Sequence, residues 1–202
     1  MNQRFLIIRL GSLGDLVHAV PAVAALREAY PDAQIDWLVE RAHAPLLAQV
    51  PAISRVIVLK GRSLGGWLAT RAELRAQRYD VAIDLQGLIK SAALARLSGA
   101  IRVVGFDTRA LREPAARWFY TAQVEVGEGR HVIEKNLALV RTLDLGLSRT
   151  LDRAVFPFAV SPSPALESLQ SSGVSEFALL NPGAAWPNKR WPVESFAAVA
   201  RW

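Results

Sequence analysis

The sequence predicts an α/β fold, a doubly wound parallel sheet with helices on both faces. Short, continuous apolar runs recur along the chain, and most of them are followed by a segment with helical spacing. Strands that are covered on both faces are apolar throughout, and helices are their usual connections. A third observation is the glycine turn LGSLGD, residues 10–15, between the first run and the first helix, a junction where doubly wound folds place ligands.

The elements follow from these runs in chain order. The expected strands are the apolar runs at residues 4–10, 35–39, 55–59, 80–85, 101–104 and 176–180. The expected helices cover residues 15–30, 42–49, 64–78, 88–98 and 131–144. Because Leu16, Val20 and Val23 keep a helical period across Pro21, we expect a helix kinked at this proline rather than one that begins there.

The chain changes character after residue 150. Residues 151–175 are rich in proline and serine, which predicts a linker. Residues 176–202 offer one strand, a glycine turn and the beginning of a helix, too little to bury a core. We therefore expect an N-terminal domain over residues 1–150 and only the opening unit of a second domain.

Composition excludes several kinds of protein. Apolar residues make up 51% of the chain and charged residues 21%, as in globular proteins. No run reaches the ~20 uncharged apolar residues that span a bilayer, and the N-terminus lacks the pattern of a signal peptide, so we expect a cytoplasmic protein. There is no cysteine, and the three scattered histidines lack the spacing of metal ligands, so no metal site is expected.

The net charge of +6 favours anionic partners. The basic residues are dispersed and form no nucleic-acid-binding motif, so we expect no nucleic acid partner. An anionic substrate and an anionic membrane surface both remain open.

Asp15 ends the glycine turn in a place unsuited to a dinucleotide. Gly11 and Gly14 do not complete the G-x-G-x-x-G pattern, and an acid follows them directly. Asp15 either complements the positive end of the helix dipole or, at the carboxyl edge of the sheet, takes a proton from a substrate hydroxyl. A helix N-terminus lowers a carboxylate pKa, so such a base would be weak.

Other loops at the same edge carry polar and basic residues. In DLQGLIKSA we expect Asp84, Gln86, Lys90 and Ser91 to line a crevice beside Asp15, although Lys90 alone also fits an ordinary surface lysine. Further cations follow other strands and suggest a site for a multiply anionic acceptor: Lys60, Arg62, Arg109 and Arg112. In NPGAAWPNKRWP, Lys189 and Arg190 are placed to meet a phosphate, or are simply solvated.

Several motifs together resemble one family. They are RLGSLGDLVHAVPAVAALREAYPDAQIDWLVE, DLQGLIKSAAL, LREPAARWFY, HVIEKN and NPGAAWPNKRWP, and in this order they are similar to the ADP-heptose:lipopolysaccharide heptosyltransferases, most of all heptosyltransferase I. The resemblance covers essentially the whole chain. It implies the GT-B fold, in which two Rossmann-like domains face each other, and inverting transfer of heptose from ADP-heptose to Kdo of Kdo-lipid A.

The resemblance also implies roles for particular residues. Asp15 matches the general base, and Lys189 matches the lysine that neutralises the departing diphosphate. Gly14 and Arg190 fall with Lys189 on the donor side. The cations expected around the carboxylates and phosphates of the acceptor, with Gln86 beside them, are Lys60, Arg62, Lys90 and Arg112. No cofactor or metal is implied, and the enzyme is expected on the cytoplasmic face of the inner membrane as a peripheral protein.

The chain departs from the family at its C-terminus. It has no Gly-x-Asp-Thr-Gly-x-x-His loop, which the family uses to bind the diphosphate, so we expect negligible transferase activity from residues 1–202 alone. Two alternatives stay open: a non-catalytic anion-binding domain, and a nucleotide-dependent oxidoreductase in which Glu40 would bind the ribose.

Overall fold

A computed structural model describes most of the chain, in two compact units. The described residues are 3–61, 63–127, 129–143, 154–159, 162–184 and 187–201. The units are residues 1–160 and residues 161–202, and each is treated by itself below.

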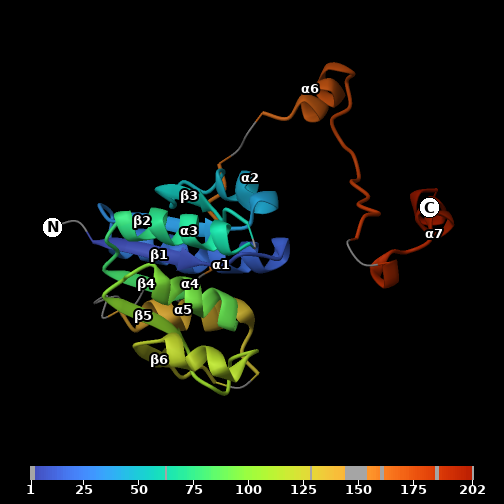
Figure 1. Cartoon of the computed structure of the whole chain (residues 1–202). Coiled ribbons are helices and arrows are strands. Elements are labelled where there is room, and N and C mark those ends of the chain that lie inside the picture. The colour runs from blue at the N-terminus through green and yellow to red at the C-terminus, as the bar shows by residue number, and fades with distance from the viewer. Residues whose placement is uncertain are drawn as a thin grey trace. The chain divides into compact units, whose positions relative to one another are not determined.

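The first unit is built on one parallel sheet of six strands in the order β3-β2-β1-β4-β5-β6 (Figure 1). The chain winds outward from β1 in both directions, so the switch point of this doubly wound sheet lies between β1 and β4. Phe5 of β1 is in register with Ile35 of β2 on one side and with Val81 of β4 on the other. The strands are β1 (Arg4–Ile8), β2 (Gln34–Val39), β3 (Arg55–Val58), β4 (Val81–Asp84), β5 (Arg102–Phe106) and β6 (Ala122–Val124).

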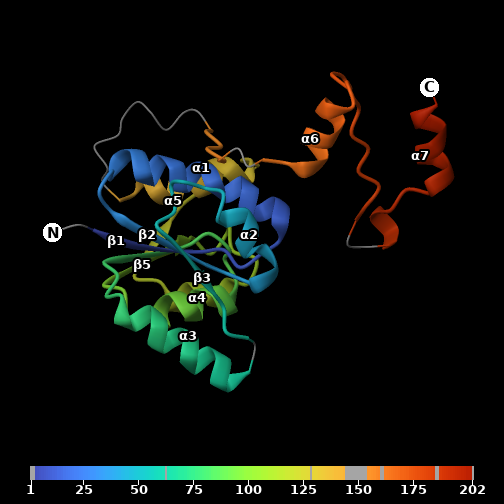
Figure 2. The same cartoon turned by 90° about the horizontal axis from the view of Figure 1, so that it is seen from above.

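Helices cover both faces of the sheet, as the sequence predicts (Figure 2). Helices α1 (Leu13–Ala29) and α5 (Val132–Arg141) pack together on one face, and α3 (Leu64–Ala76) and α4 (Ile89–Leu97) lie on the other. The short α2 (Ala44–Leu47) follows the 3-10 turn η1 (Arg41–His43).

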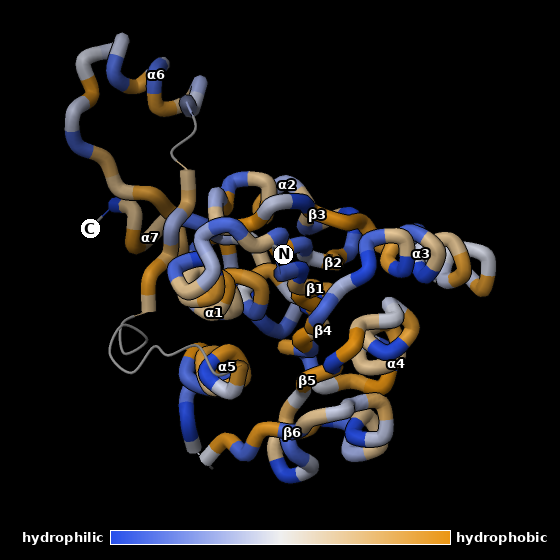
Figure 3. The backbone as a smooth tube through the Cα atoms, turned by 90° about the vertical axis from the view of Figure 1, so that its left-hand side faces the viewer, coloured by the Kyte–Doolittle hydropathy of each residue, from blue (hydrophilic) through white to orange (hydrophobic). Residues whose placement is uncertain are grey.

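The core has two layers because the side chains of the central strands alternate between the faces. Phe5 and Ile7 belong to the cluster under α1 and α5, whereas Leu6 and Ile8 belong to the cluster on the opposite face. The tube in Figure 3 is correspondingly orange along much of β1, β4 and β5. Burial on both sides explains why these strands read as continuous apolar runs.

Helix α1 confirms the helix expected after the glycine turn. Ser12 is its N-cap residue, and the helix continues past the buried Pro21 to Ala29. The alternative, a helix beginning at Pro21, is wrong.

Other elements differ from the expectation. The helix expected over 42–49 is a 3-10 turn followed by the four residues of α2. Strand β6 and the 3-10 helix η2 (Pro114–Phe119) were not predicted, since three residues of strand are too short to show a period. None of the described helices is long and apolar enough to cross a bilayer.

The second unit contains α6 (Pro164–Ser171), η3 (Pro187–Lys189) and α7 (Val193–Ala200). The strand expected over 176–180 is wrong: residues 174–184 hold neither helix nor strand. A strand needs a neighbour for its backbone hydrogen bonds, and the described part of this unit offers none. Helix α6 lies within the predicted linker, with Ser163 accepting a hydrogen bond from the Leu166 N–H and Pro164 at the first helical position.

Candidate functional site

The candidate site lies at the switch point, where the carboxyl ends of β1 and β4 are adjacent. Ile8 is in register with Asp84, so the residues that follow each strand leave the sheet side by side. Two hydrogen bonds join the following segments in a reciprocal way. The Arg9 guanidinium donates to the Leu85 carbonyl oxygen at 2.5 Å, and the Leu10 N–H donates to Gln86 Oε1 at 2.8 Å. The two loops are therefore held as one piece of structure.

Asp15 lies at this edge, in the first turn of α1. Its Oδ2 accepts from the Ser12 hydroxyl at 3.2 Å and from the Ser12 N–H at 3.4 Å. The same oxygen forms an ion pair with Arg9 Nη2 at 2.7 Å, and the Asp15 side chain is 26% exposed. Burial acts to raise the pKa of Asp15, but the charge and hydrogen bond of Arg9, together with the hydrogen bonds from the Ser12 N–H and hydroxyl, outweigh it and lower the pKa. Asp15 is therefore ionised at neutral pH and accessible to a ligand.

Asp15 borders a cavity of about 350 Å³. Of the residues predicted to form the site, the structure brings Asp15, Gln86 and Arg112 together here. Sequence reasoning missed four other polar or charged residues of the lining, which are Arg9, Arg130, Lys135 and Asn136.

The cavity can satisfy a ligand that carries both hydroxyl and anionic groups. Arg112, Arg130 and Lys135 supply cations, and Asp15 supplies an acceptor for a hydroxyl proton. Asn136 donates through Nδ2 to the His18 carbonyl at 3.1 Å, while its buried Oδ1 has no partner among the described residues. This combination of groups suits a sugar acid better than an apolar ligand.

Asp84 and Ser91 were expected to line the crevice, and this expectation is wrong. Both side chains are fully buried, and Asp84 accepts hydrogen bonds from Ser91 Oγ at 2.9 Å and Tyr120 Oη at 2.7 Å. It also accepts from the Gln86 N–H at 2.9 Å and the Gly87 N–H at 3.3 Å. Burial raises the pKa of Asp84, and burial and the Asp84 charge raise that of Tyr120. This network fixes the turn that carries Gln86, but it offers no group to a ligand.

Both of the predicted acceptor-binding lysines, Lys60 and Lys90, lie outside this cavity. Lys90 forms an ion pair with Glu40 at 3.0 Å, and Lys60 forms one with Glu73 at 3.1 Å. Lys60 lines a separate pocket of about 220 Å³ with Glu40 and Arg41. Arg62 lies outside the described residues.

The predicted donor-side residues are exposed. Gly14 is in the first turn of α1, where an added Cβ would meet no atom within 4 Å. In the second unit, Lys189 ends η3, and Arg190 Nε donates to the Ala184 carbonyl at 2.8 Å.

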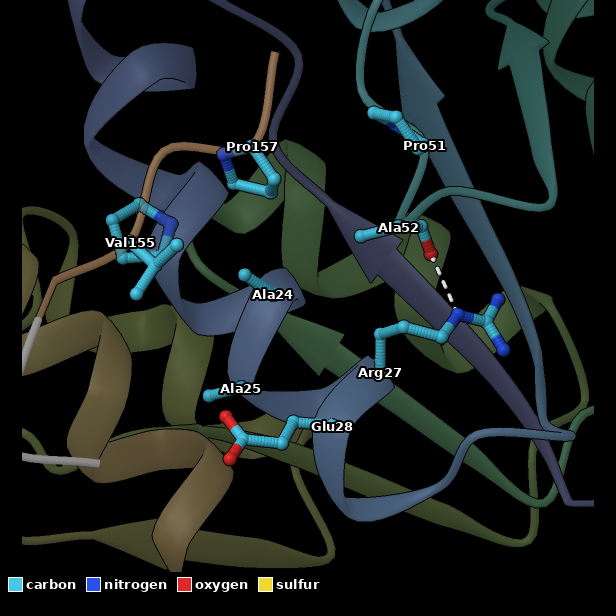
Figure 4. A pocket seen from close by; sticks show the side chains of 9 residues that line it. Ala24, Ala25, Arg27, Glu28, Pro51, Ala52, Val155 and Pro157 are labelled. Carbon is cyan, nitrogen blue, oxygen red and sulfur yellow. Dashed lines mark hydrogen bonds between the residues drawn. The ribbon is translucent and has the colours of Figure 1, made fainter. Parts of the chain in front are cut away.

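A second cavity of about 350 Å³, beside α1, is lined mainly by apolar and backbone atoms (Figure 4). Val155 and Pro157 border it on one side and Pro51 on the other. The Arg27 guanidinium donates hydrogen bonds to backbone carbonyl oxygens, from Nε to Ala52 at 3.2 Å and from Nη1 to Ala33 at 2.7 Å. Glu28 is the other charged residue of this lining, and a single carboxylate offers a ligand less than the several polar groups that converge on the cavity at Asp15, so this cavity is the weaker candidate. Among the described residues, no group of three or more His, Asp or Glu is placed to hold a metal ion.

Comparison with known proteins gives a consistent result. Residues 67–202 match the model of glycosyltransferase family 9 (heptosyltransferase). The chain is similar to lipopolysaccharide heptosyltransferase 1 of Pseudomonas aeruginosa, with 34% identity over 94% of this chain and 55% of that protein. It is 32% identical to the enzyme of the same name from Escherichia coli K12, over 95% of this chain and 62% of that protein.

Solved structures agree. E. coli heptosyltransferase WaaC with ADP matches with a TM-score of 0.79 and 30% identity, over 98% of this chain and 62% of that one. WaaC with ADP-2-deoxy-2-fluoro heptose matches with a TM-score of 0.78 and 29% identity, over 98% and 64%. The chain thus spans roughly three fifths of the length of these relatives, and its sheet corresponds to the N-terminal Rossmann-like domain of a GT-B fold.

Proposed function

The chain belongs to glycosyltransferase family 9, the heptosyltransferases, and on that premise we propose that it carries the acceptor site and the general base of an enzyme that transfers heptose from ADP-heptose to Kdo of Kdo-lipid A. The observation that carries this proposal is the ionised, accessible Asp15 on a cavity that also presents Arg112, Arg130 and Lys135. Cations suit the carboxylates of a sugar acid, and the carboxylate suits its hydroxyl.

The proposed reaction is a direct displacement with inversion. The acceptor hydroxyl oxygen forms a bond to the anomeric carbon of the heptose while its proton passes to Asp15. The bond from that carbon to the diphosphate oxygen breaks, and ADP leaves with the electron pair. Because the pKa of Asp15 is lowered, proton transfer belongs late in the step, when the attacking oxygen has become acidic.

Fixed cations are proposed to balance the charge of the leaving diphosphate, with no metal ion. Lys189 is the proposed main contributor, with Arg190 and the backbone at Gly14 on the donor side. The predicted cations Lys60, Arg62 and Lys90 are kept as proposed outer contacts of the large anionic acceptor. The proposed place of action is the cytoplasmic face of the inner membrane, where Kdo-lipid A is anchored.

Calorimetry with the two substrates tests this function on the chain itself. Kdo-lipid A, dispersed in detergent, is expected to bind, and ADP-heptose is expected to bind much more weakly. Binding of neither ligand would contradict the proposed acceptor site. Tight binding of a nicotinamide dinucleotide instead would favour the oxidoreductase alternative.

We predict that Lys135→Ala weakens acceptor binding more than Lys60→Ala does. Lys135 lines the cavity, whereas the charge of Lys60 is already paired with Glu73. Loss of one charge-assisted hydrogen bond corresponds to about a tenfold increase in Kd, and we expect this for Lys135→Ala. Equal losses in the two variants, measured by calorimetry at one salt concentration, would place the acceptor elsewhere.

A further inference from the structure

Arg9 is a charged residue in an otherwise apolar stretch. It follows the last residue of β1, yet its side chain is only 6% exposed. A buried charge is costly unless partners compensate it. The partners of Arg9 therefore indicate what the residue is for.

The Arg9 guanidinium joins two elements of the candidate site. Nη1 donates to the Leu85 carbonyl oxygen, at the end of β4, at 2.5 Å. Nη2 lies 2.7 Å from Asp15 Oδ2, at the start of α1. Because the guanidinium is planar and rigid, a fixed Nη1 also fixes where Nη2 points. The position of Asp15 thus depends on the backbone of the segment that directly follows β4.

The two oxygens of Asp15 have different surroundings. The Arg9 guanidinium and both donor groups of Ser12 contact Oδ2. No hydrogen bond or ion pair within the described ranges reaches Oδ1. The carboxylate is thus held from one side, and Asp15 borders the cavity.

The geometry points to Arg9 as the positioning residue of the reaction: it holds Asp15 by Oδ2, so that Oδ1 is left to take the proton of the acceptor hydroxyl. This inference rests on the proposed function for its chemical step, but not for the positioning itself. Arg9 transfers nothing. The proton moves from the hydroxyl to Oδ1 as that oxygen bonds to the anomeric carbon and ADP departs.

The ion pair also sets the pH range of the base. None of the other charged or titratable groups around the glycine turn and the cavity forms a hydrogen bond or ion pair with Asp15 among the described residues. These groups are His18, His43, Asp84, Arg112, Arg130, His131 and Lys135. Arg9 is the cation that touches the carboxylate, so removing it raises the pKa of Asp15. Since the base acts in its ionised form, the acidic limb of the pH–rate profile then moves to higher pH.

Arg9→Met and Arg9→Lys test the inference on the ligand-free chain. Methionine fills the buried space without charge, and lysine keeps the charge but loses the planar fork. An NMR titration of the Asp15 carboxyl carbon is expected to show a raised pKa in Arg9→Met and a smaller change in Arg9→Lys. Arg27→Met is the matched control at the other end of α1, and it is expected to leave the titration of Asp15 unchanged. An unchanged pKa of Asp15 in folded Arg9→Met would overturn the inference.

Activity supplies the second measurement, in the whole gene product that contains these residues. For Arg9→Met we expect the acidic limb of kcat/KM to move to higher pH by the same amount as the NMR titration, and the KM for acceptor to change little. If Arg9→Met changed the KM for acceptor but left the acidic limb of the pH profile at the wild-type pH, Arg9 would be a binding residue and the inference would be overturned. Failure of the proposed function would give a different result. Arg9→Met would still shift the pKa of Asp15 as expected, but substitution of Asp15 itself would leave the rate of heptose transfer unchanged.

Discussion

Asp15→Asn is expected to lower kcat for heptose transfer by about 10²–10⁴-fold, the range typical of a lost general base. Asparagine keeps the size of the side chain and an oxygen that can accept hydrogen bonds from Ser12. It cannot take a proton. The measurement is steady-state transfer from ADP-heptose to Kdo-lipid A by the whole gene product, with acceptor binding measured separately by calorimetry.

The control for Asp15→Asn is Asp32→Asn, at an exposed turn after α1. It removes the same charge without touching the candidate site, and kcat is expected to stay at the wild-type value. Acceptor binding is expected to survive Asp15→Asn, since the cations of the cavity remain. If Asp15→Asn kept the wild-type kcat, Asp15 would be a helix-capping residue and not the general base.

Gly105→Ala is expected to destabilise the first unit by about 3 kcal/mol, as overpacking a filled site does. Gly105 lies in β5 under the ring of Tyr120, and a Cβ there would come within 2.3 Å of Tyr120 Cζ. The ring cannot move away freely, because its hydroxyl donates to Asp84 at 2.7 Å. The same movement would release the turn that carries Gln86.

Urea unfolding followed by circular dichroism measures this loss. Gly65→Ala is the matched control, because a Cβ on Gly65 meets no atom within 4 Å and alanine favours the helical conformation of α3. Its stability is expected to equal or slightly exceed that of the wild type. If Gly105→Ala were as stable as Gly65→Ala, the ring of Tyr120 would not cover Gly105 in solution.

The sheet was predictable because burial on two faces leaves a simple pattern. The strands near the switch point contribute side chains to both layers of the core, so each is a continuous apolar run. The position of Asp15 followed from the same pattern, since it comes directly after the first run and its glycine turn. The prediction of a strand over 176–180 was wrong, because a strand also requires a neighbour for its backbone hydrogen bonds and an apolar run does not specify one.

The candidate site was only partly predictable, because its members meet through the fold. Lys135 comes from α5, far along the chain from Asp15, and helical periodicity alone does not tell which sheet edge a helix end will reach. Lys90 forms an ion pair with Glu40, fifty residues away in the sequence, and no local pattern predicts such a pair. For Arg9 a signal was present: a charge that ends an apolar strand must find a partner.

The reciprocal bonds between the two loops have a consequence for sequence variation. Each bond pairs a side chain of one loop with the backbone of the other: Arg9 with the Leu85 carbonyl, and Gln86 with the Leu10 N–H. The backbone partners tolerate any apolar residue that fills the core, since the bonds do not use their side chains. We therefore expect relatives to vary among apolar residues at positions 10 and 85 while positions 9 and 86 stay constrained, so that tolerant and intolerant residues stand next to each other directly after β1 and directly after β4.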